Sequence, residues 1–459
     1  MDFPSIFNNV LGPVMRGPSS SHTAAAVRIG LLGRKLLSEE AAYARFTFDP
    51  RGSLASTYRG QGSSMGLAAG LLGMDITDKD LMRAEKICSE KGLEIEYRIE
   101  KFNDEHPNIY NTYIKGTSGK EVSFVALSTG GGIIRLISLN GKKVDDDHDY
   151  INPLMPVQLK REPRLPFKGV AELAVILDEK GGLLSDYALQ YETAVGNLSA
   201  NDVMILSRSH MYIMREALEN GLAGTTYDDR ILQRQSHLFS EAPKEVSLIP
   251  ADLANKIIQA VTAVMEVKSS MGLIVAAPTA GSCGTLPGVL IPAAEAGFKT
   301  EDDMVRALLA AGLIGVFIAR EGGFAAEDGG CQYECGSASG MAAAALVEMM
   351  GGSGQMALNA ASMALQNTLG MICDPVADRV EVPCLGKNIM TALNALAAAN
   401  MTIAGYDHVI PLDEVIKAMK EVGDDMHHKY RCTCKGGLSA TPTAKRIHKN
   451  LSSSKKKVE

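Results

Sequence analysis

Tryptophan is absent from the 459-residue chain, and aromatic residues make up only 5% of it. A core built around large aromatic rings is therefore excluded. Glycine (45 residues) and methionine (22) are abundant instead, which predicts closely packed helices with small contact residues and methionine as gap filler. The length suits two or three domains, and a chain that is 46% hydrophobic and 22% charged is typical of a folded protein.

Long apolar runs and a basic leader are also lacking. The apolar segments, such as residues 307–319, stay short of the ~20 residues that a membrane span needs. The start, Met-Asp-Phe-Pro, has neither region of a secretory signal. The formal net charge of -7 gives no reason to expect nucleic acid or an anionic membrane as partner. We expect a cytoplasmic protein, whose eight cysteines stay reduced and, where clustered, bind metal or react.

Hydrophobic periodicity divides the chain into two parts of different texture. Residues 1–150 mix a helix (27–37) with strand-like runs (44–48, 94–98, 121–127 and 133–139), so we predict an α+β domain. The last two runs flank Gly130-Gly131-Gly132, which predicts a turn or bulge.

The second part follows a charged, proline-rich linker at 151–166. Residues 167–448 are predicted to form a larger, mostly α-helical catalytic domain, and 449–459 a flexible basic tail. The predicted helices are 173–183, 198–220, 252–265, 302–319, 338–350, 355–369, 387–404 and 412–422. The small residues on these helices weakly favour a homodimer.

Three cysteines in the second part lie in turns marked by glycine or proline: Cys331, Cys373 and Cys384. Thiolates select zinc or iron–sulfur clusters. A structural zinc site usually has two paired knuckles; Cys331 and Cys335 provide one pair, but no second pair matches it. The second cysteine lies 42 positions after the first and the third 11 after the second, a spread that suits a cluster held by several helices. Buried core cysteines are the alternative.

An ordered series of motifs surrounds these cysteines. In the first part it comprises Gly17-Pro18-Ser19-Ser20-Ser21-His22-Thr23, Gly52-Ser53-Leu54, His106-Pro107-Asn108 and the Gly130-Gly131-Gly132 turn. In the second part it comprises Ala277-Pro278-Thr279-Ala280-Gly281-Ser282, Gly330-Cys331-Gln332, Ser337-Ala338-Ser339-Gly340-Met341, Cys373-Asp374-Pro375-Val376, Val382-Pro383-Cys384 and Gly436-Gly437-Leu438.

This series resembles the iron–sulfur-dependent L-serine dehydratases over nearly the whole chain, in the single-chain form that fuses the β-type and α-type parts. The resemblance implies a [4Fe–4S] cluster on Cys331, Cys373 and Cys384, with one iron open to substrate. It also implies a small amino acid as substrate and the dehydration and deamination of L-serine to pyruvate and ammonia. No regulatory ACT domain follows the first part.

Dehydrating a β-hydroxy amino acid requires a Lewis acid for the hydroxyl, a base for the Cα proton and donors for the carboxylate. Hydroxyls and backbone N–H groups suit the carboxylate. We predict that two loops bind substrate: Ser19, Ser20, Ser21 and Thr23 in the first, and Pro278, Thr279, Ala280, Gly281 and Ser282 in the second. A plain helix N-cap is the alternative for the serine run.

Two histidines of the first part, His22 and His106, are the candidate acid–base residues, because imidazole titrates near neutral pH. A structural, hydrogen-bonded histidine is the commoner use. Asp374 either orients the site or forms a turn before Pro375.

The chain departs from the family pattern at three places. Gly60-Gln61-Gly62 stands where the family commonly has Gly-His-Gly, and glutamine cannot accept a proton. Residues 320–328 replace another loop, so that Arg320 or Glu327 could read a substrate group that serine lacks. Cys432 and Cys434 are extra, and either approach the cluster or are bland thiols.

These departures keep two other functions open: cluster chemistry on another β-substituted amino acid or hydroxy acid, and a non-catalytic cluster protein that senses oxygen or iron. A pyridoxal-phosphate dehydratase lacks support, because no lysine loop is paired with a glycine-rich phosphate turn.

Overall fold

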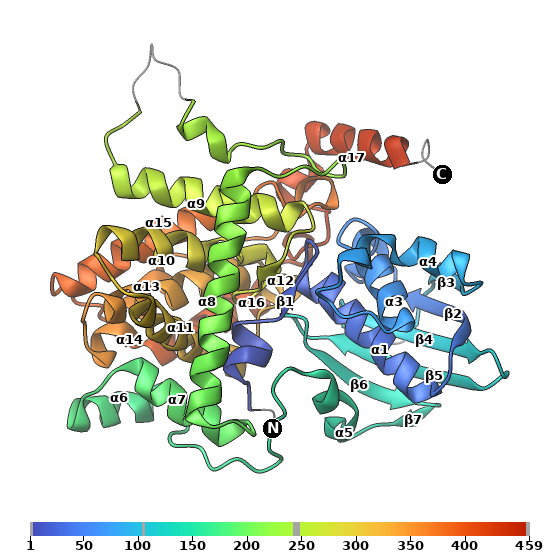
Figure 1. Ribbon diagram of the computed structural model, residues 1–459, viewed down its shortest axis with the longest axis horizontal. Helices are drawn as coiled ribbons and strands as arrows, with labels where there is room; N and C mark the ends of the chain where they lie inside the picture. The colour runs from blue at the N-terminus through green and yellow to red at the C-terminus, as the bar shows by residue number, and fades with distance from the viewer. Residues whose placement is uncertain (1–2, 103–105, 242–247, 456–459) are drawn as a thin grey trace.

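The computed structural model describes residues 3–102, 106–241 and 248–455, which form an α+β part followed by a helical part (Figure 1). The α+β part is built on a mixed six-stranded sheet of order β3-β2-β4-β5-β6-β7, in which only β2 and β3 run parallel. Its strands are β2 (Ala41–Phe48), β3 (Glu94–Ile99), β4 (Ile109–Gly116), β5 (Glu121–Ser128), β6 (Ile134–Leu139) and β7 (Lys142–Lys143). The helices are α1 (Ala25–Leu37), α2 (Leu54–Thr57), α3 (Ser63–Leu72), α4 (Ala84–Glu90) and α5 (His148–Ile151).

Alternating burial explains how this sheet is covered. Along β5, every second residue is buried, so one face packs inward, and α1 and α3 lie over that face (Figure 1). Small residues let α1 and α3 approach closely: a Cβ atom added to Gly70 would lie 2.1 Å from the carbonyl oxygen of Val27. Small residues therefore lie at this helix contact, as the sequence predicts.

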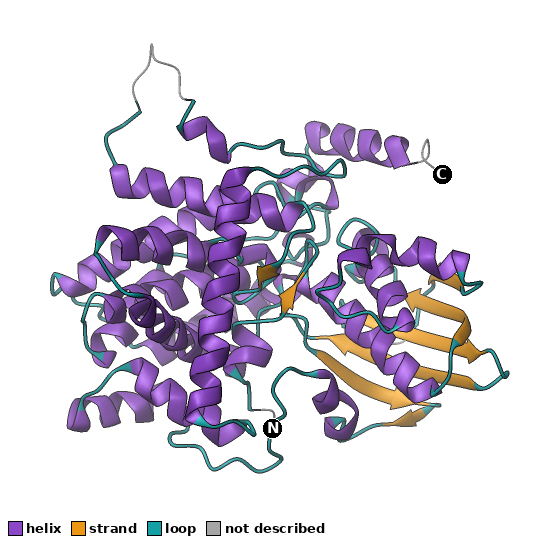
Figure 2. Ribbon diagram, viewed as in Figure 1, coloured by secondary structure: helices purple, strands orange, loops and turns teal. Residues whose placement is uncertain are grey.

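The helical part runs to Lys455 and confirms the predicted fold class; strands are confined almost wholly to the first part (Figure 2). Its helices are α6 (Val170–Lys180), α7 (Leu184–Val195), α8 (Ala200–Ala223), α9 (Asp252–Ser269), α10 (Thr285–Ala296), α11 (Glu301–Glu321), α12 (Ala326–Gly329), α13 (Ser337–Met349), α14 (Gly354–Gln366), α15 (Cys384–Ile403), α16 (Leu412–Asp425) and α17 (Pro442–Lys455). The predicted basic tail at 449–459 is therefore helical up to Lys455, and its last four residues lie outside the described chain. Within the described residues, no helix is long and apolar enough to cross a membrane.

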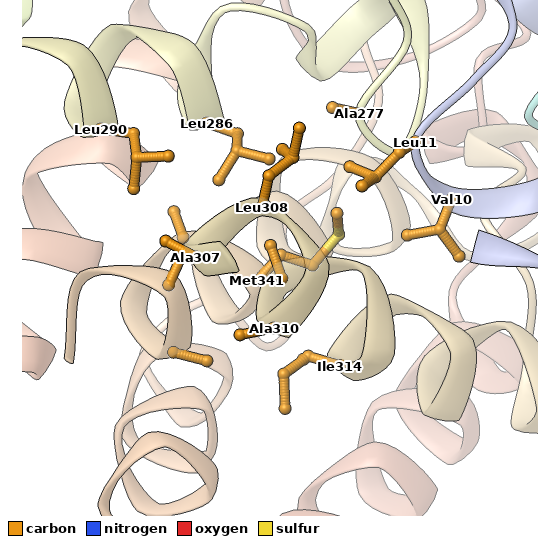
Figure 3. Close-up of a cluster of buried hydrophobic side chains, with 14 of the residues drawn as sticks. Val10, Leu11, Ala277, Leu286, Leu290, Ala307, Leu308, Ala310, Ile314 and Met341 are labelled. Carbon is orange, nitrogen blue, oxygen red and sulfur yellow. The ribbon is translucent and has the colours of Figure 1, made fainter. Parts of the chain in front are cut away.

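The main core lies between α10, α11 and α13, and Figure 3 shows part of it. The helix α11 is apolar along most of its length, and Leu308 and Ile314 are fully buried. Leu286 of α10 and Met341 of α13 pack against them. Helices that are apolar on every face must lie inside a bundle, as the sequence predicts.

The first residues of the chain join this helical core rather than the sheet. Val10 and Leu11 extend into the core beside α11 (Figure 3). A little further along, β1 (Val14–Met15) pairs antiparallel with β8 (Ile274–Val275). This two-stranded ribbon lies between the two parts (Figure 2) and leads directly into the serine-rich loop. Residues 6–15 thus pack with the second part although they precede residue 150 in the sequence. The domain boundary at residue 150 remains a prediction.

Candidate active site

The two predicted substrate loops and the cysteines meet where the α+β part faces the helical part. Ala280 N donates a hydrogen bond to Ser20 Oγ (3.2 Å), which joins the two loops directly. Ser21 Oγ donates to Glu327 Oε1 (2.9 Å) across the same boundary. Gln61 Nε2 lies 3.7 Å from Cys432 Sγ. The candidate site therefore draws residues from both parts of the chain.

The serine-rich loop forms one π-helical turn, Ser20–Ala24, that leads into α1. Gly17 precedes it with φ +112°, a conformation that favours glycine, and the Thr23 side chain fills the space where a Cβ would lie. Ser19 occupies the N-cap position, yet its side chain makes no capping hydrogen bond. A plain N-cap role therefore does not account for this residue. The whole loop is buried, with Thr23 Oγ1 donating to the Gln61 carbonyl (2.9 Å).

His22 is fully buried at the centre of this loop, and both of its ring nitrogens are engaged. The Thr57 hydroxyl donates to the Ser53 carbonyl (2.8 Å), so it must accept from His22 Nε2–H at 2.9 Å. The other nitrogen, Nδ1, then accepts from the Ser19 hydroxyl at 3.1 Å, because the single proton of the Ser21 hydroxyl goes to Glu327. Burial lowers the pKa of His22, although the Glu327 carboxylate opposes this shift. The geometry therefore describes a neutral imidazole.

His106, the second predicted acid–base residue, lies half-buried in the segment before β4. Its Nδ1 accepts a hydrogen bond from Asn108 N (3.1 Å). The adjoining Pro107 carbonyl accepts from Ser53 N (2.9 Å), and Ser53 Oγ in turn donates to the Cys432 carbonyl (3.2 Å). His106 thus lies near the site's edge rather than among its buried groups.

The second loop, Ala277–Ser282, follows β8 and is almost wholly enclosed. Ser282 shapes the loop itself: its hydroxyl lies 3.2 Å from the Ala277 carbonyl and accepts from Thr279 N (3.3 Å). Thr279 Oγ1 contacts a residue outside the loop, donating a hydrogen bond to Glu334 Oε1 (2.7 Å). A Cβ on Gly281 would lie 2.9 Å from that same oxygen, so glycine is what allows the acid to approach.

Two acids, the buried Glu327 of α12 and the half-buried Glu334, line the junction. Glu327 is 5% exposed; its Oε1 lies 3.4 Å from His22 Nδ1, and its buried Oε2 has no hydrogen-bond partner among the described residues. Burial and the charge of Glu327 raise the pKa of Glu334 to about 7. The Gly130 turn supports α12, because a Cβ there would lie 2.7 Å from Ala325 N.

The cysteines gather beside these acids. Cys331 Sγ, Cys373 Sγ and a carboxylate oxygen of Glu334 lie within 4.8 Å of one another. Cys432 packs in the same buried cluster, and side-chain hydrogen bonds with Cys331 and Cys432 raise the pKa of Cys373 well above its ordinary value. Cys384 begins α15, and burial followed by the charge of Cys331 raises its pKa. All three predicted ligands are therefore buried. Cys331 and Cys373 share one cluster with Cys432, whereas Cys384 packs with the main helical core, near enough to Cys331 to be affected by its charge.

Cys432 and Cys434 differ in their surroundings. Cys432 is held against Cys373 by a backbone hydrogen bond, from Cys432 N to the Cys373 carbonyl (3.2 Å). Cys434 is only partly buried, and its thiol lies 3.9 Å from the Pro375 carbonyl, away from this cluster. Of the two alternatives for the extra cysteines, a position beside the predicted ligands describes Cys432 and not Cys434.

A lysine at the start of α15 supplies positive charge. Lys387 Nζ donates to Asp374 Oδ1 (2.8 Å) and to the Ile372 carbonyl (2.6 Å), and it lies 3.7 Å from Cys331 Sγ. Asp374 also accepts from Leu438 N (2.9 Å), so it orients the site as one of its two predicted roles requires. The neighbouring Asn388 Nδ2 bonds the Gly281 and Cys384 carbonyls, each at 2.8 Å.

Sequence reasoning missed three of these residues: Glu334, Lys387 and Asn388. A signal for them exists. Glu334 interrupts the run between Cys331 and the Ala-rich α13, and Lys387-Asn388 are the only strongly polar residues in the first two turns of α15. A charge in an otherwise buried helix start calls for a partner.

Buried thiols, paired hydroxyl loops and enclosed acids define an enzyme site that suits a soft metal and a small polar substrate. The sequence profile of the serine dehydratase alpha chain matches residues 179–439. An L-serine dehydratase of Streptomyces coelicolor is 32% identical over 92% of this chain and 96% of its own. L-serine dehydratase 1 of Escherichia coli is 30% identical over 92% and 96%. A probable L-serine dehydratase alpha chain of Bacillus subtilis is 39% identical over 62% and 95%.

The chain belongs to the L-serine dehydratase family. It is therefore an enzyme of the ammonia-lyase class.

Proposed function

We propose that the protein dehydrates and deaminates L-serine to pyruvate and ammonia with a [4Fe–4S] cluster held by Cys331, Cys373 and Cys384. One observation carries the proposal: buried thiols from three separate segments lie beside two loops rich in hydroxyl groups. Family membership supports the reaction, and the donor set supports the cofactor.

The residues present fit such a cluster. Hydrogen bonds with Cys331 and Cys432 raise the thiol pKa of Cys373, and burial raises that of Cys384, so thiolates here need a strong cationic centre. The Lys387 ammonium beside Cys331 offsets part of the remaining negative charge. Glycine and proline flank the cysteines in turns, which lets backbone come close to a bulky group. When bound, the cluster supplies a Lewis-acidic iron that polarises the bond to the β-hydroxyl.

The chain's own residues bind and orient the substrate. The hydroxyls of Ser19, Ser20, Ser21 and Thr23 and the loop Pro278–Ser282 form the carboxylate cradle. Their burial makes each hydrogen bond stronger than in water and keeps water from the reacting carbon.

His22 and His106 remain the proposed acid–base residues. His22 Nδ1 accepts from the Ser19 hydroxyl, so it can take a proton relayed through Ser19. Removal of the base should lower kcat with little change in KM. We expect this of the His22→Gln or the His106→Gln variant, with His408→Gln as the control, since His408 is half-buried outside the candidate site.

The first experiment is anaerobic purification, with iron, sulfide and the visible spectrum measured per chain and L-serine assayed for pyruvate before and after exposure to air. About four irons, a brown protein and air-sensitive pyruvate formation are expected. A colourless protein after anaerobic reconstitution would refute the cluster. A brown protein inert towards L-serine would instead direct the search to other β-substituted amino acids or to a sensor role.

Single Cys→Ser variants then test the ligands. Variants at Cys331, Cys373 and Cys384 should each lose most of their iron, whereas Cys88→Ser is the matched control. Cys88 is equally buried but belongs to the core of the α+β part. Full iron content in any of the three ligand variants would remove that residue from the set. A cytoplasmic location and a homodimer stay predictions, the latter testable by light scattering.

A further inference from the structure

Glu327 presents a buried charge that the residues around it do not neutralise. The side chain is 3% exposed, and Ser21 Oγ donates to its Oε1 (2.9 Å). Its Oε2 is buried, with no hydrogen-bond partner among the described residues. Leaving a buried carboxylate oxygen without a donor is costly, and such an oxygen calls for a partner brought by a ligand.

The cations of the region are engaged elsewhere. Lys387 Nζ donates to Asp374 Oδ1, and Lys268 Nζ donates to the Val380 carbonyl. Within 4 Å of Glu327, the only described ion-pair partner is His22, which is neutral in the hydrogen-bonding arrangement derived above. Among the described residues, the Glu327 carboxyl group therefore has no lysine or arginine partner.

The position of this oxygen matches the layout of an α-amino acid. Ser21 belongs to the proposed carboxylate cradle and also anchors Glu327, so the two features adjoin. In an amino acid, the carboxylate and the ammonium group leave the same carbon and lie side by side. On the other side, Ala326, the residue before Glu327, packs in one cluster with Cys331, Cys373 and Cys432, so α12 adjoins the thiols as well as the cradle.

We propose that Glu327 is the specificity-determining residue that receives the α-ammonium group of the substrate. The inference rests on the proposed amino-acid substrate and adds the group that separates amino acids from hydroxy acids of the same shape. Glu334, the other acid of the site, is already bonded by Thr279 and has no buried, unpartnered oxygen among the described residues.

Two ligands that differ in one group test the proposal. L-Alanine and L-lactate share the carboxylate and the methyl group, and neither carries the β-hydroxyl that would be eliminated. Titration calorimetry on the anaerobic, cluster-loaded protein measures both affinities without turnover. The wild type should bind L-alanine about tenfold to a hundredfold tighter than L-lactate, as expected for a charged hydrogen bond.

Glu327→Gln removes the charge and keeps the shape. We expect its affinity for L-alanine to fall until the two ligands bind within about threefold of each other, while L-lactate binding is unchanged. Glu327→Asp should retain part of the preference, and it serves as the second variant if glutamine disturbs folding. Glu334→Gln is the matched control and should keep the wild-type ratio.

Three results would overturn the proposal: a wild-type ratio below threefold, an unchanged ratio in Glu327→Gln, or a collapsed ratio in Glu334→Gln. A loss of kcat in Glu327→Gln with the ratio intact would make Glu327 a proton-transfer residue instead. L-Serine turnover by the wild type is measured separately, so failure of the proposed reaction and failure of this inference are distinguishable.

Discussion

Glu192 ties the start of the chain to α7 and gives the protein a built-in dependence on pH. Its side chain is fully buried, the Ser5 hydroxyl donates to it, and Ile6 N donates to Oε2 at 2.8 Å. Burial raises the pKa of Glu192 from 4.5 to about 7, although the hydrogen bonds from residues 5–7 oppose the shift.

The sign of the effect follows from this pKa. The folded state holds the proton more tightly than the unfolded chain, so the contribution to stability is complete below pH 4.5 and is lost as pH rises to about 7. A shift of this size corresponds to about 3 kcal/mol, from ~1.4 kcal/mol per pKa unit. The same free energy corresponds to about a hundredfold change in the equilibrium constant for local opening of the segment that Glu192 holds. The protection of its amides from hydrogen exchange should change by the same factor.

Amide hydrogen exchange measured by mass spectrometry on a peptide spanning residues 3–12 reports this local opening. After correction for intrinsic exchange, wild-type protection should fall by up to about a hundredfold between pH 5 and pH 8. Glu192→Gln cannot titrate and should show a nearly flat profile. Glu348→Gln removes another buried carboxyl, bonded to Ser185 N (3.2 Å), and should leave the wild-type profile in place. Identical slopes in wild type and Glu192→Gln would refute the reasoning.

Three further predictions concern the cofactor and the packing. Lys387→Met should lower iron per chain and speed bleaching in air, since losing a group that supports a ligand typically costs tenfold to a hundredfold in metal affinity. Gly70→Ala should lower the free energy of unfolding by about 3 kcal/mol in chemical denaturation, because its Cβ would lie 2.1 Å from the Val27 oxygen. In Gly386→Ala, the added Cβ meets nothing within 4 Å, so the free energy of unfolding should stay the same or rise by up to ~1 kcal/mol. Ser199→Ala removes the capping box of α8 and should cost about 1 kcal/mol, seen as a lower Tm.

Periodicity was sufficient to predict most of the longer helices and the strands β2, β3, β5 and β6, because each is a continuous pattern of local residues. It did not predict α3, α7 or α17. The helix α10 was missed because prolines at 287 and 292 argue against a helix. Burial on every side, chiefly against α9 and α13, outweighs that local preference. The strand β4 was also missed: its outward positions carry Asn111 and Lys115, and its buried face includes the polar Thr112, so the alternation is weak.

The site was predictable as a set of motifs but not as a set of contacts. The sequence placed Ser20 and Ala280 in separate loops that each suit a carboxylate, and only the fold joins them through a hydrogen bond. Gln61 and Cys432 were read as two independent departures from the family pattern, yet they touch. Contacts of this kind join residues hundreds of positions apart, which no local pattern encodes.

The two parts of the chain are joined by more than the linker at 151–166. The first residues pack into the helical core, the β1–β8 ribbon pairs across the boundary, and the Gly130 turn supports α12 from the other side. Two of these contacts lie next to residues of the candidate site: the ribbon leads into both hydroxyl loops, and α12 carries Glu327. Relative movement of the two parts would separate Ser19–Thr23 from the second hydroxyl loop, from Glu327 and from Cys432, so the proposed chemistry requires a rigid boundary.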